Sequence, residues 1–400
     1  MNTTARVVAI LAVSAFASTC AFRILDPALP QLSAEFGVTT GRAGDVVMWF
    51  ALAYGIAQFI YGPLGDRFGK FRVLSIATAA SAIGSLVVAM APTFEVVLAG
   101  RFLSGATGAA IIPLALAWIG DHVPYEQRQA TLSRFILGNI LGITSGLWIG
   151  GVFTDATGWR GALYFLAGIY VVVGVMLFSQ RRHVDEVPAA YTQIRFFEPL
   201  AQVFRSRWAW VVLFAVMFEG ALVFGSVAFV PAYLQFTYEI TPTRAGLVTS
   251  LFAAGALIYV SRARWLIECL GERKLALAGG WTLAASYLIY LYGPTWQWAL
   301  IAGVLCGLGY YFIHAVLQAR ATQMVEQVRA TAVAMFACFM FVGQAVGIVL
   351  GSWVVDAFGL RTLFWVSVLG LPMLGAWFSY KLRQHMAVTQ GGVTQGRTAS

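Results

Sequence analysis

The chain has 400 residues, of which 60% are hydrophobic and 11% are charged, and its net charge is +9. Soluble proteins carry a charge on about a quarter of their residues, so this composition excludes an ordinary soluble domain. The apolar residues form long blocks instead of short alternating segments, which also excludes a membrane β-barrel.

Twelve apolar blocks follow one another along the chain. Each is long enough to cross a bilayer as a helix, which takes about 20 residues, so the sequence predicts an all-α polytopic membrane protein. For the first block a cleaved signal is the alternative, since Arg6 precedes it and Ala15-Phe16-Ala17 resembles a cleavage site. The apolar run continues to Leu25, which favours a retained span. The blocks cover residues 7–29, 44–62, 73–91, 96–119, 133–154, 161–179, 209–234, 244–261, 275–292, 296–319, 330–354 and 362–380.

Most Lys and Arg residues lie in every second loop. If the N-terminus is cytoplasmic, twenty of the 26 basic residues fall in cytoplasmic segments, and the outer loops hold only Arg42, Arg160, Arg244 and Arg361. This bias predicts that both termini are cytoplasmic, and we expect a monomer in a bacterial inner membrane. The positive charge then reflects orientation and contact with lipid headgroups, and we expect no nucleic-acid partner.

A hydrophilic interruption at Gln180–Trp208 divides the spans into six and six. We therefore expect a first six-helix bundle over residues 1–179, a cytoplasmic linker over 180–208 and a second bundle over 209–380. Residues 381–400 are polar and contain Gly and Gln, so we expect them to form a disordered cytoplasmic tail.

The two halves repeat one another at an offset of 201–202 residues. Gly69 matches Gly271, and "GITSGLWIGGVFTDATGWR" (Gly142–Arg160) lies over "GQAVGIVLGSWVVDAFGLR" (Gly343–Arg361). Because six helices per repeat is an even number, the repeats share one orientation and are related by an axis along the membrane normal. Two such bundles are typical of alternating-access carriers, whose binding site lies between them near the midplane.

Charged residues inside spans are costly, and each is a functional candidate. Asp26 lies near the outer end of the first span and Arg101 at a matching depth in the fourth, so we expect them to form an ion pair. Arg23, one turn before Asp26, is an alternative partner. Glu219 lies near the middle of the seventh span. Burial favours its protonated form, so it can bind and release a proton; a structural role or a contact with a cationic substrate are the alternatives.

Several polar and aromatic residues near the middle of spans are candidates for a substrate cavity that suits an amphipathic organic molecule. The alternative for each aromatic residue is a position facing lipid, and for His314 a hydrogen-bonded place in the core is favoured. The candidates are Tyr54, Gln58, Phe218, Glu219, Tyr233, Tyr310 and His314.

Four stretches together resemble a known family. "DPALP" (Asp26–Pro30), "GPLGDRFGKFRVL" (Gly62–Leu74), "RFLSGATGAA" (Arg101–Ala110) and "GITSGLWIGG" (Gly142–Gly151) are similar to signatures of the major facilitator superfamily (MFS). Within it, the chain resembles the twelve-helix drug/proton antiporters. It departs from their fifth-helix motif at Leu147, where that motif has Pro.

The resemblance implies two six-helix bundles related by a pseudo-two-fold axis, with Asp26 and Arg101 taking part in proton coupling. It also implies a cytoplasmic gate in which Asp66 lies near a helix N-terminus of the other half, where the helix dipole favours its charge. The gate residues are Gly62, Gly65, Asp66, Arg67, Gly69 and Arg72. A second set forms a small-residue face for close helix packing and consists of Gly142, Gly146, Gly150 and Gly151.

The pattern favours a secondary transporter of small organic molecules that works by proton-coupled efflux. An uptake symporter or facilitator is the alternative, supported by Leu147, and a membrane sensor that does not transport is a third. We expect no cofactor, no metal and no enzyme activity, because Walker A, HExxH and GxSxG sequences are absent and the four Cys residues have no metal-like spacing.

Overall fold

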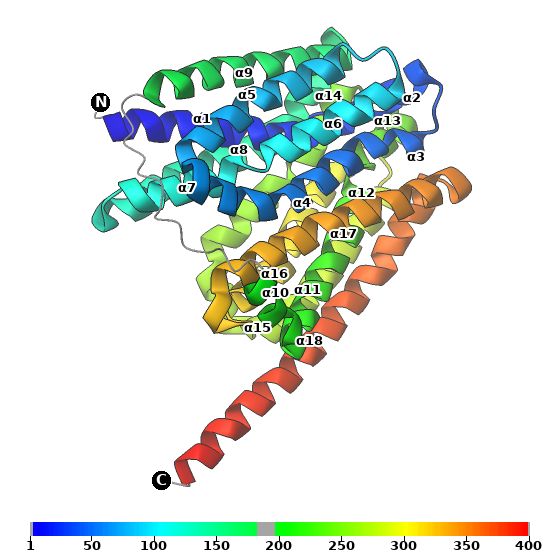
Figure 1. Cartoon of the computed structure of the whole chain (residues 1–400). Helices are drawn as coiled ribbons and strands as arrows, with labels where there is room; N and C mark the ends of the chain where they lie inside the picture. Colours follow the sequence, from blue (N-terminus) through cyan, green and yellow to red (C-terminus); the bar gives the residue numbers. More distant parts are fainter. Residues whose placement is uncertain (1–2, 182–196, 399–400) are drawn as a thin grey trace.

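A computed structural model describes residues 3–181 and 197–398, and within these ranges every regular element is a helix (Figure 1). Within these ranges, eleven stretches are long and apolar enough to cross a membrane. One of them, Pro242–Tyr292, has 51 residues, far more than one crossing needs. It is interrupted at Gly271, whose φ of 70° and ψ of 162° are not helical. The described chain therefore makes the twelve crossings that the sequence predicts.

The first half provides six crossings, several of which are broken into shorter helices. Its elements are α1 (Thr3–Arg23), η1 (Asp26–Ala28), α2 (Leu29–Phe36), α3 (Thr40–Ala43), α4 (Asp45–Phe68), α5 (Lys70–Ala89), α6 (Phe94–Gly108), α7 (Ile111–His122), α8 (Tyr125–Ala156) and α9 (Trp159–Gln180).

The second half repeats this arrangement after the expected linker, of which residues 182–196 lie outside the described chain. Its elements are α10 (Phe197–Arg205), α11 (Arg207–Glu219), η3 (Gly220–Phe224, a π-helical turn), α12 (Gly225–Val227), α13 (Val230–Tyr238), α14 (Pro242–Ser250), α15 (Phe252–Tyr292), α16 (Trp298–Ala321), η4 (Glu326–Val328), α17 (Arg329–Phe358) and α18 (Leu360–Thr398).

The prediction of a disordered tail over residues 381–400 is wrong for most of its length, because α18 continues to Thr398. The helix extends because its first turns beyond the predicted span still find partners. Leu382 is fully buried, and the ring of His385 stacks on Trp208 with 3.9 Å between ring centroids.

Glycines bring the same pairs of helices together in both halves. In the first half, Gly146 and Gly150 of α8 lie directly against the backbone of Cys20 and Ile24 at the end of α1. In the second half, Gly347 of α17 lies against Ala221 in the same way, 201 residues later. A side chain at any of these glycines would collide with the facing backbone. This packing fixes where α1 and η3 run along the centre of the molecule.

The two halves lie one above the other in Figure 1, and each has a basic end and a distal end. The end that carries both termini and the turns at Gly69 and Gly271 is called the basic end. The distal end carries the turns at Gly37, Gly158 and Gly359. Each of these five glycines has a positive φ, which other residues rarely adopt.

At the distal end, two aspartates close the molecule by bonding across the halves. Asp356 of α17 accepts hydrogen bonds from the backbone N–H of Gly41 (2.9 Å) and the hydroxyl of Thr39 (2.6 Å) at the start of α3. Asp155 of α8 accepts from the backbone N–H (2.9 Å) and the hydroxyl of Thr243 at the start of α14. Charged acceptors at helix N-termini are favoured, so these two symmetric contacts hold the distal end shut.

We expect the double variant Asp155→Asn/Asp356→Asn to open the distal end more often, because it weakens the bonds of both carboxylates. A loss of about 1 kcal/mol would raise the open-to-closed ratio about fivefold. Electron–electron distance measurements between spin labels at Ala156 and Thr295, in a background without native Cys, report this ratio. Glu95→Gln is the matched control, because Glu95 pairs with Arg42 inside the first half (3.6 Å). An unchanged distance distribution in the double variant would contradict the closing role.

Candidate functional site

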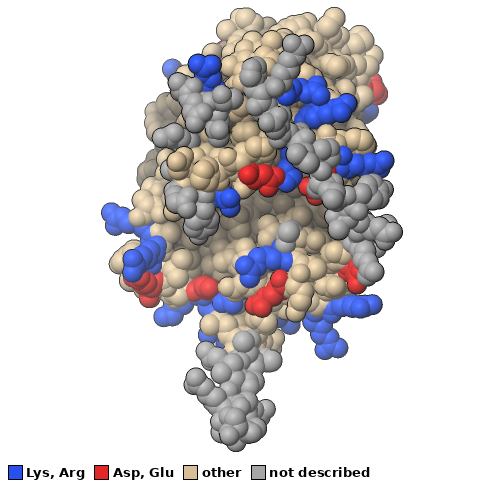
Figure 2. Space-filling model, turned by 60° about the vertical axis from the view of Figure 1, so that its left-hand side comes forward, with Lys and Arg blue, Asp and Glu red and all other residues tan. Residues whose placement is uncertain are grey.

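A cavity of about 360 Å³ lies between the two halves. Residues from α1, α4, α7 and α8 form one wall, and residues from η3, α12, α14, α15, α16 and α17 form the other. Figure 2 turns the basic end forward and shows the surface hollowed between the upper and lower parts of the molecule, with charged side chains around the hollow. Since the distal end is closed by Asp155 and Asp356, the cavity is approached from the basic end.

Four of the predicted cavity residues line this space: Tyr54, Gln58, Tyr310 and His314. The ring of Tyr54 lies 4.9 Å from that of Phe341 on the opposite wall, measured between centroids. The ring of Tyr310 stacks on that of His314 at 4.7 Å. The walls therefore combine aromatic and aliphatic side chains with several polar ones.

The other predicted cavity residues do not line it. Phe218 points away and is half exposed on the outer surface of the helix bundle. Tyr233 is buried inside the second half, where its ring packs against Phe364 at 4.9 Å. Both predictions used depth along a helix, which gives no information on the direction of a side chain around it. Glu219 is fully buried one layer behind the cavity wall.

The expected ion pair between Asp26 and Arg101 is not formed. Instead Nη1 of Arg23 donates to Oδ2 of Asp26 at 2.8 Å, which is the alternative that the sequence left open. The chain turns directly after Arg23, where α1 ends and η1 begins with Asp26, and so brings the two side chains together. Asp26 is fully buried, whereas Arg23 lines the cavity.

Arg101 donates hydrogen bonds to backbone carbonyls at the ends of two helices. Its Nε donates to the carbonyl of Val46 at the start of α4, and its Nη1 donates to the carbonyl of Ala21 in the last turn of α1, both at 2.9 Å. Carbonyls in the last turn of a helix have no partner within the helix, so the guanidinium satisfies one that α1 leaves open. The ring of Phe50 lies 4.2 Å from the guanidinium carbon. Arg101 therefore clamps α1 to α4.

Glu219 and His314 form a buried acid–base pair beside the cavity. Oε2 of Glu219 lies 2.8 Å from Nδ1 of His314, while Oε1 of Glu219 has no partner in the described chain. The π-helical turn η3 follows Glu219 directly, and such turns are frequent at functional sites. His314 lines the cavity, whereas Glu219 does not, so the histidine lies between the carboxyl and the cavity.

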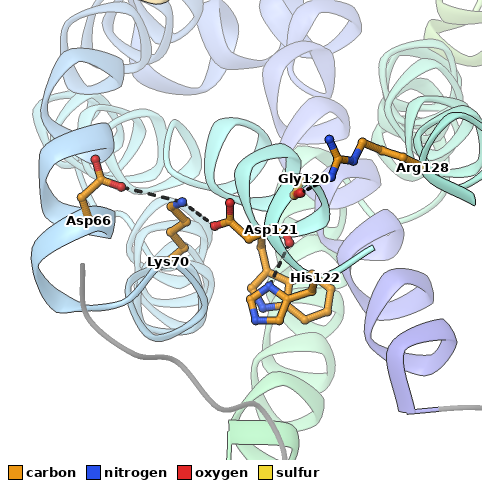
Figure 3. A network of polar contacts seen from close by, with 7 residues as sticks. Asp66, Lys70, Gly120, Asp121, His122 and Arg128 are labelled. Atoms are coloured by element: carbon orange, nitrogen blue, oxygen red, sulfur yellow. Dashed lines mark hydrogen bonds and ion pairs between the residues drawn. The ribbon is translucent and has the colours of Figure 1, made fainter. Parts of the chain in front are cut away.

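Asp66 and Gly65 of the predicted gate contact their own half in this conformation. Figure 3 shows Asp66 and Asp121 on either side of Lys70, whose Nζ lies 3.8 Å and 2.5 Å from their oxygens. In this conformation Asp66 therefore does not lie at a helix N-terminus of the second half as expected. The two halves stand apart at the basic end. Gly65 packs against Leu114, and the positive φ of Gly69 makes the turn into α5.

The remaining gate residues lie on the same surface, and Gly62 has open space around it. Arg67 lies over the ring of Phe68 at 5.1 Å, and Arg72 also has an interaction partner. Nearby, Nη2 of Arg128 donates to the carbonyl of Gly120 at 2.6 Å and ties the start of α8 to the end of α7 (Figure 3).

The second half carries the counterpart of the Lys70–Asp121 pair with the charges reversed. Glu272 follows Gly271 as Lys70 follows Gly69, and Nε of Arg320 in the last turn of α16 donates to it at 2.8 Å. In both halves an ion pair therefore joins the start of the crossing that follows the glycine turn to the end of the next crossing. These ends belong to α5 and α7 in the first half, and to α15 and α16 in the second.

Sequence reasoning missed several residues that the structure brings to the site. Asn139 lines the cavity, and Asp155 and Asp356 close its distal end. The aspartates were visible as matching positions in the two repeats, which was a usable signal. Asn139 belongs to no motif. Among the described residues, no three His, Cys, Asp or Glu side chains lie together as metal ligands would.

A family model described as the Major Facilitator Superfamily matches residues 11–262 and 212–396. The chain belongs to this superfamily. Its twelve crossings in two similar halves and its interhelical cavity are the MFS fold, as the resemblance predicted.

Individual MFS proteins are similar to the chain over most of its length. The probable L-galactonate transporter of Escherichia coli is 26% identical to this chain. The aligned part covers 70% of this chain and just under two thirds (66%) of that protein. The efflux pump aflT of Aspergillus parasiticus is 24% identical over 92% of this chain and 70% of the length of the pump. A bacterial homolog of the human lysosomal transporter Spinster, solved in an inward-facing and unoccupied conformation, has a TM-score of 0.74 over 95% of both chains at 15% identity.

We expect Arg101→Met to destabilise the protein, because two backbone carbonyls at the ends of α1 and α4 lose a charged donor. The midpoint of thermal unfolding in detergent should fall by about 5 °C or more, and Arg101→Lys should restore little, since a single ammonium does not reproduce the guanidinium fork. Arg67→Met serves as the exposed control and should leave the midpoint within about 1 °C. A normal midpoint in Arg101→Met would contradict the clamp.

Proposed function

We propose that this MFS protein is a secondary transporter that moves small organic molecules across a membrane by alternating access, and that it has no enzymatic activity. The observation that carries this proposal is the cavity between the halves, which is closed at the distal end by Asp155 and Asp356 and approached from the basic end. Breaking those contacts and joining the halves at the basic end would expose the same cavity to the other side.

The basic end lies in the cytoplasm of this proposed transporter, so both termini are cytoplasmic and the described conformation faces inward. The bias of Lys and Arg residues toward this end supports that orientation. We place the protein in a bacterial inner membrane as a monomer. The six-helix units are residues 1–179 and 209–380, joined by the linker over 180–208.

Protons are the coupling ion, and Glu219 with His314 is the site that binds them. The pair is shielded from water but reaches the cavity through the imidazole, which is the arrangement that a transmembrane proton site needs. Asp26, whose Oδ1 has no partner in the described chain, is the second candidate. A proton on Asp26 would weaken its bond to Arg23 and so alter the wall of the cavity.

Efflux is the proposed direction, supported by the similarity to the efflux pump aflT, which extends over 92% of this chain. Uptake by symport is the second candidate, and a specific observation favours it. Leu147 stands in place of the Pro that marks the antiporter motif, and α8 runs through it as one unbroken helix. The relative from Escherichia coli, named a probable L-galactonate transporter, suggests an organic acid as one class of cargo.

Reconstitution into liposomes with an imposed pH gradient and a panel of labelled organic molecules tests the proposal. We expect efflux driven by inward proton flow, and a loss of about tenfold or more in gradient-driven flux for Glu219→Gln or Asp26→Asn, with exchange at equal pH retained. Glu95→Gln makes the same chemical change outside the cavity and should keep coupling. Flux that ignores the gradient in the unmodified protein and that both variants keep would exclude proton coupling, and uptake driven by inward protons would establish symport.

The gate residues are proposed to act when the basic end closes, with Asp66 meeting a helix N-terminus of the second half. We expect Asp66→Asn to insert normally and to bind ligand, but to transport at least about fivefold more slowly, because closure loses a charged contact. Glu268→Gln is the control, since Glu268 occupies the equivalent place in the second half and pairs with Arg264. A normal transport rate in Asp66→Asn would leave the aspartate without a gating role.

A further inference from the structure

Three polar side-chain atoms in the cavity wall have no hydrogen-bond partner in the described chain. They are Nη2 of Arg23, Oδ1 of Asn139 and Nε2 of Gln344. Arg23 is only 4% exposed and Gln344 only 1%. Buried polar groups in native proteins are nearly always bonded, so three unbonded groups on residues that line one cavity indicate a missing partner there.

The charges around the cavity select the sign of that partner. Among the described lining residues there is an arginine and a histidine, but no aspartate or glutamate. The two nearest buried carboxylates, Asp26 and Glu219, lie behind the wall, and each is bonded to the basic residue in front of it, Arg23 or His314. A cation in the cavity would therefore meet no carboxylate, whereas an anion would meet an arginine.

Arg23 keeps one arm available for such an anion. A guanidinium can hold a carboxylate with two N–H groups side by side. Asp26 accepts from Nη1 alone, so Nη2 can donate to a second acceptor without displacing it. The rings of Phe224 and Phe22 lie 5.0 Å and 5.7 Å from the guanidinium carbon and hold its plane in place. Phe224 belongs to the second half, so this contact already bridges the two bundles.

We propose that the cavity binds an organic monocarboxylate with an aromatic or alicyclic body, whose carboxylate accepts a hydrogen bond from Nη2 of Arg23. The amides of Asn139 and Gln344 bond the remaining polar atoms of the ligand, and Gln344 does so from the second half. One arginine suits one negative charge and does not suit a dicarboxylate. The apolar body packs among the aromatic side chains of the wall, which include Phe22, Tyr54, Phe224, Phe252, Tyr310 and Phe341.

This inference names the cargo of the proposed transporter, and so it rests on that proposal. A volume of about 360 Å³ lies at the lower end of the range that holds drug-sized ligands. A ligand of one or two fused rings with one carboxylate fits such a space. Contact with Arg23 on one half and Gln344 on the other gives the ligand a means to draw the halves together.

Titration calorimetry on the purified full chain in detergent tests the inference with 2-naphthoate, its neutral amide 2-naphthamide and the cation 2-naphthylmethylammonium. We expect 2-naphthoate to bind at least about tenfold more tightly than 2-naphthamide, because only the carboxylate gains a charge-assisted bond. The preference should vanish in Arg23→Gln and fall several-fold in Gln344→Leu. Arg264→Gln, whose side chain is 93% exposed, is the control and should keep it.

Arg23→Gln leaves Asp26 without its partner, so the double variant Arg23→Gln/Asp26→Asn removes both charges together and keeps the pair neutral. It should also lose the preference for 2-naphthoate. Equal binding of 2-naphthoate and 2-naphthamide to the unmodified protein would overturn the inference, as would tightest binding of the cation or a preference that survives in a folded double variant. Binding of 2-naphthoate without any transport in liposomes would contradict the proposed function and leave this inference standing.

Discussion

The close approach of α8 to α1 determines much of what surrounds the cavity. Backbone meets backbone at Gly146 and Gly150, so α1 has one position along the centre of the first half. That position brings the end of α1 to Arg101, which bonds the carbonyl of Ala21, and it directs Arg23 toward the second half. The same contact recurs between α17 and η3, where it places the segment that follows Glu219. Glycine packing therefore sets the frame on which the charged groups are arranged.

A common rule links the two buried acids. Each lies behind a basic side chain that forms part of the cavity wall, and each leaves one oxygen without a partner in the described chain. Neither carboxylate faces the cavity, so in the proposed mechanism a proton or a cargo molecule would act on it through its basic partner. Such an arrangement would separate the cargo from the proton by one side chain. An exposed acid would instead bind a cation directly and would lose that separation.

Sequence reasoning predicted the fold more fully than the site. Apolar block length, the bias of basic residues and the repeat gave twelve crossings in two halves, because these signals depend on the membrane and not on side-chain direction. Depth along a span suggested that Asp26 meets Arg101, but depth does not say which way a side chain points around its helix. The turn between α1 and η1 brings Asp26 to Arg23, and a separation of 95 residues in the sequence hid the contact between Glu219 and His314.

The reversed ion pairs at the basic end bear on how the two halves have diverged. The same contact is made with opposite charges in the two halves, by Lys70 and Asp121 in the first and by Glu272 and Arg320 in the second. If only one residue of a pair were replaced by its counterpart from the other half, two like charges would face each other at that contact. The two residues of each pair can therefore reverse their charges only together, although the halves otherwise repeat one another.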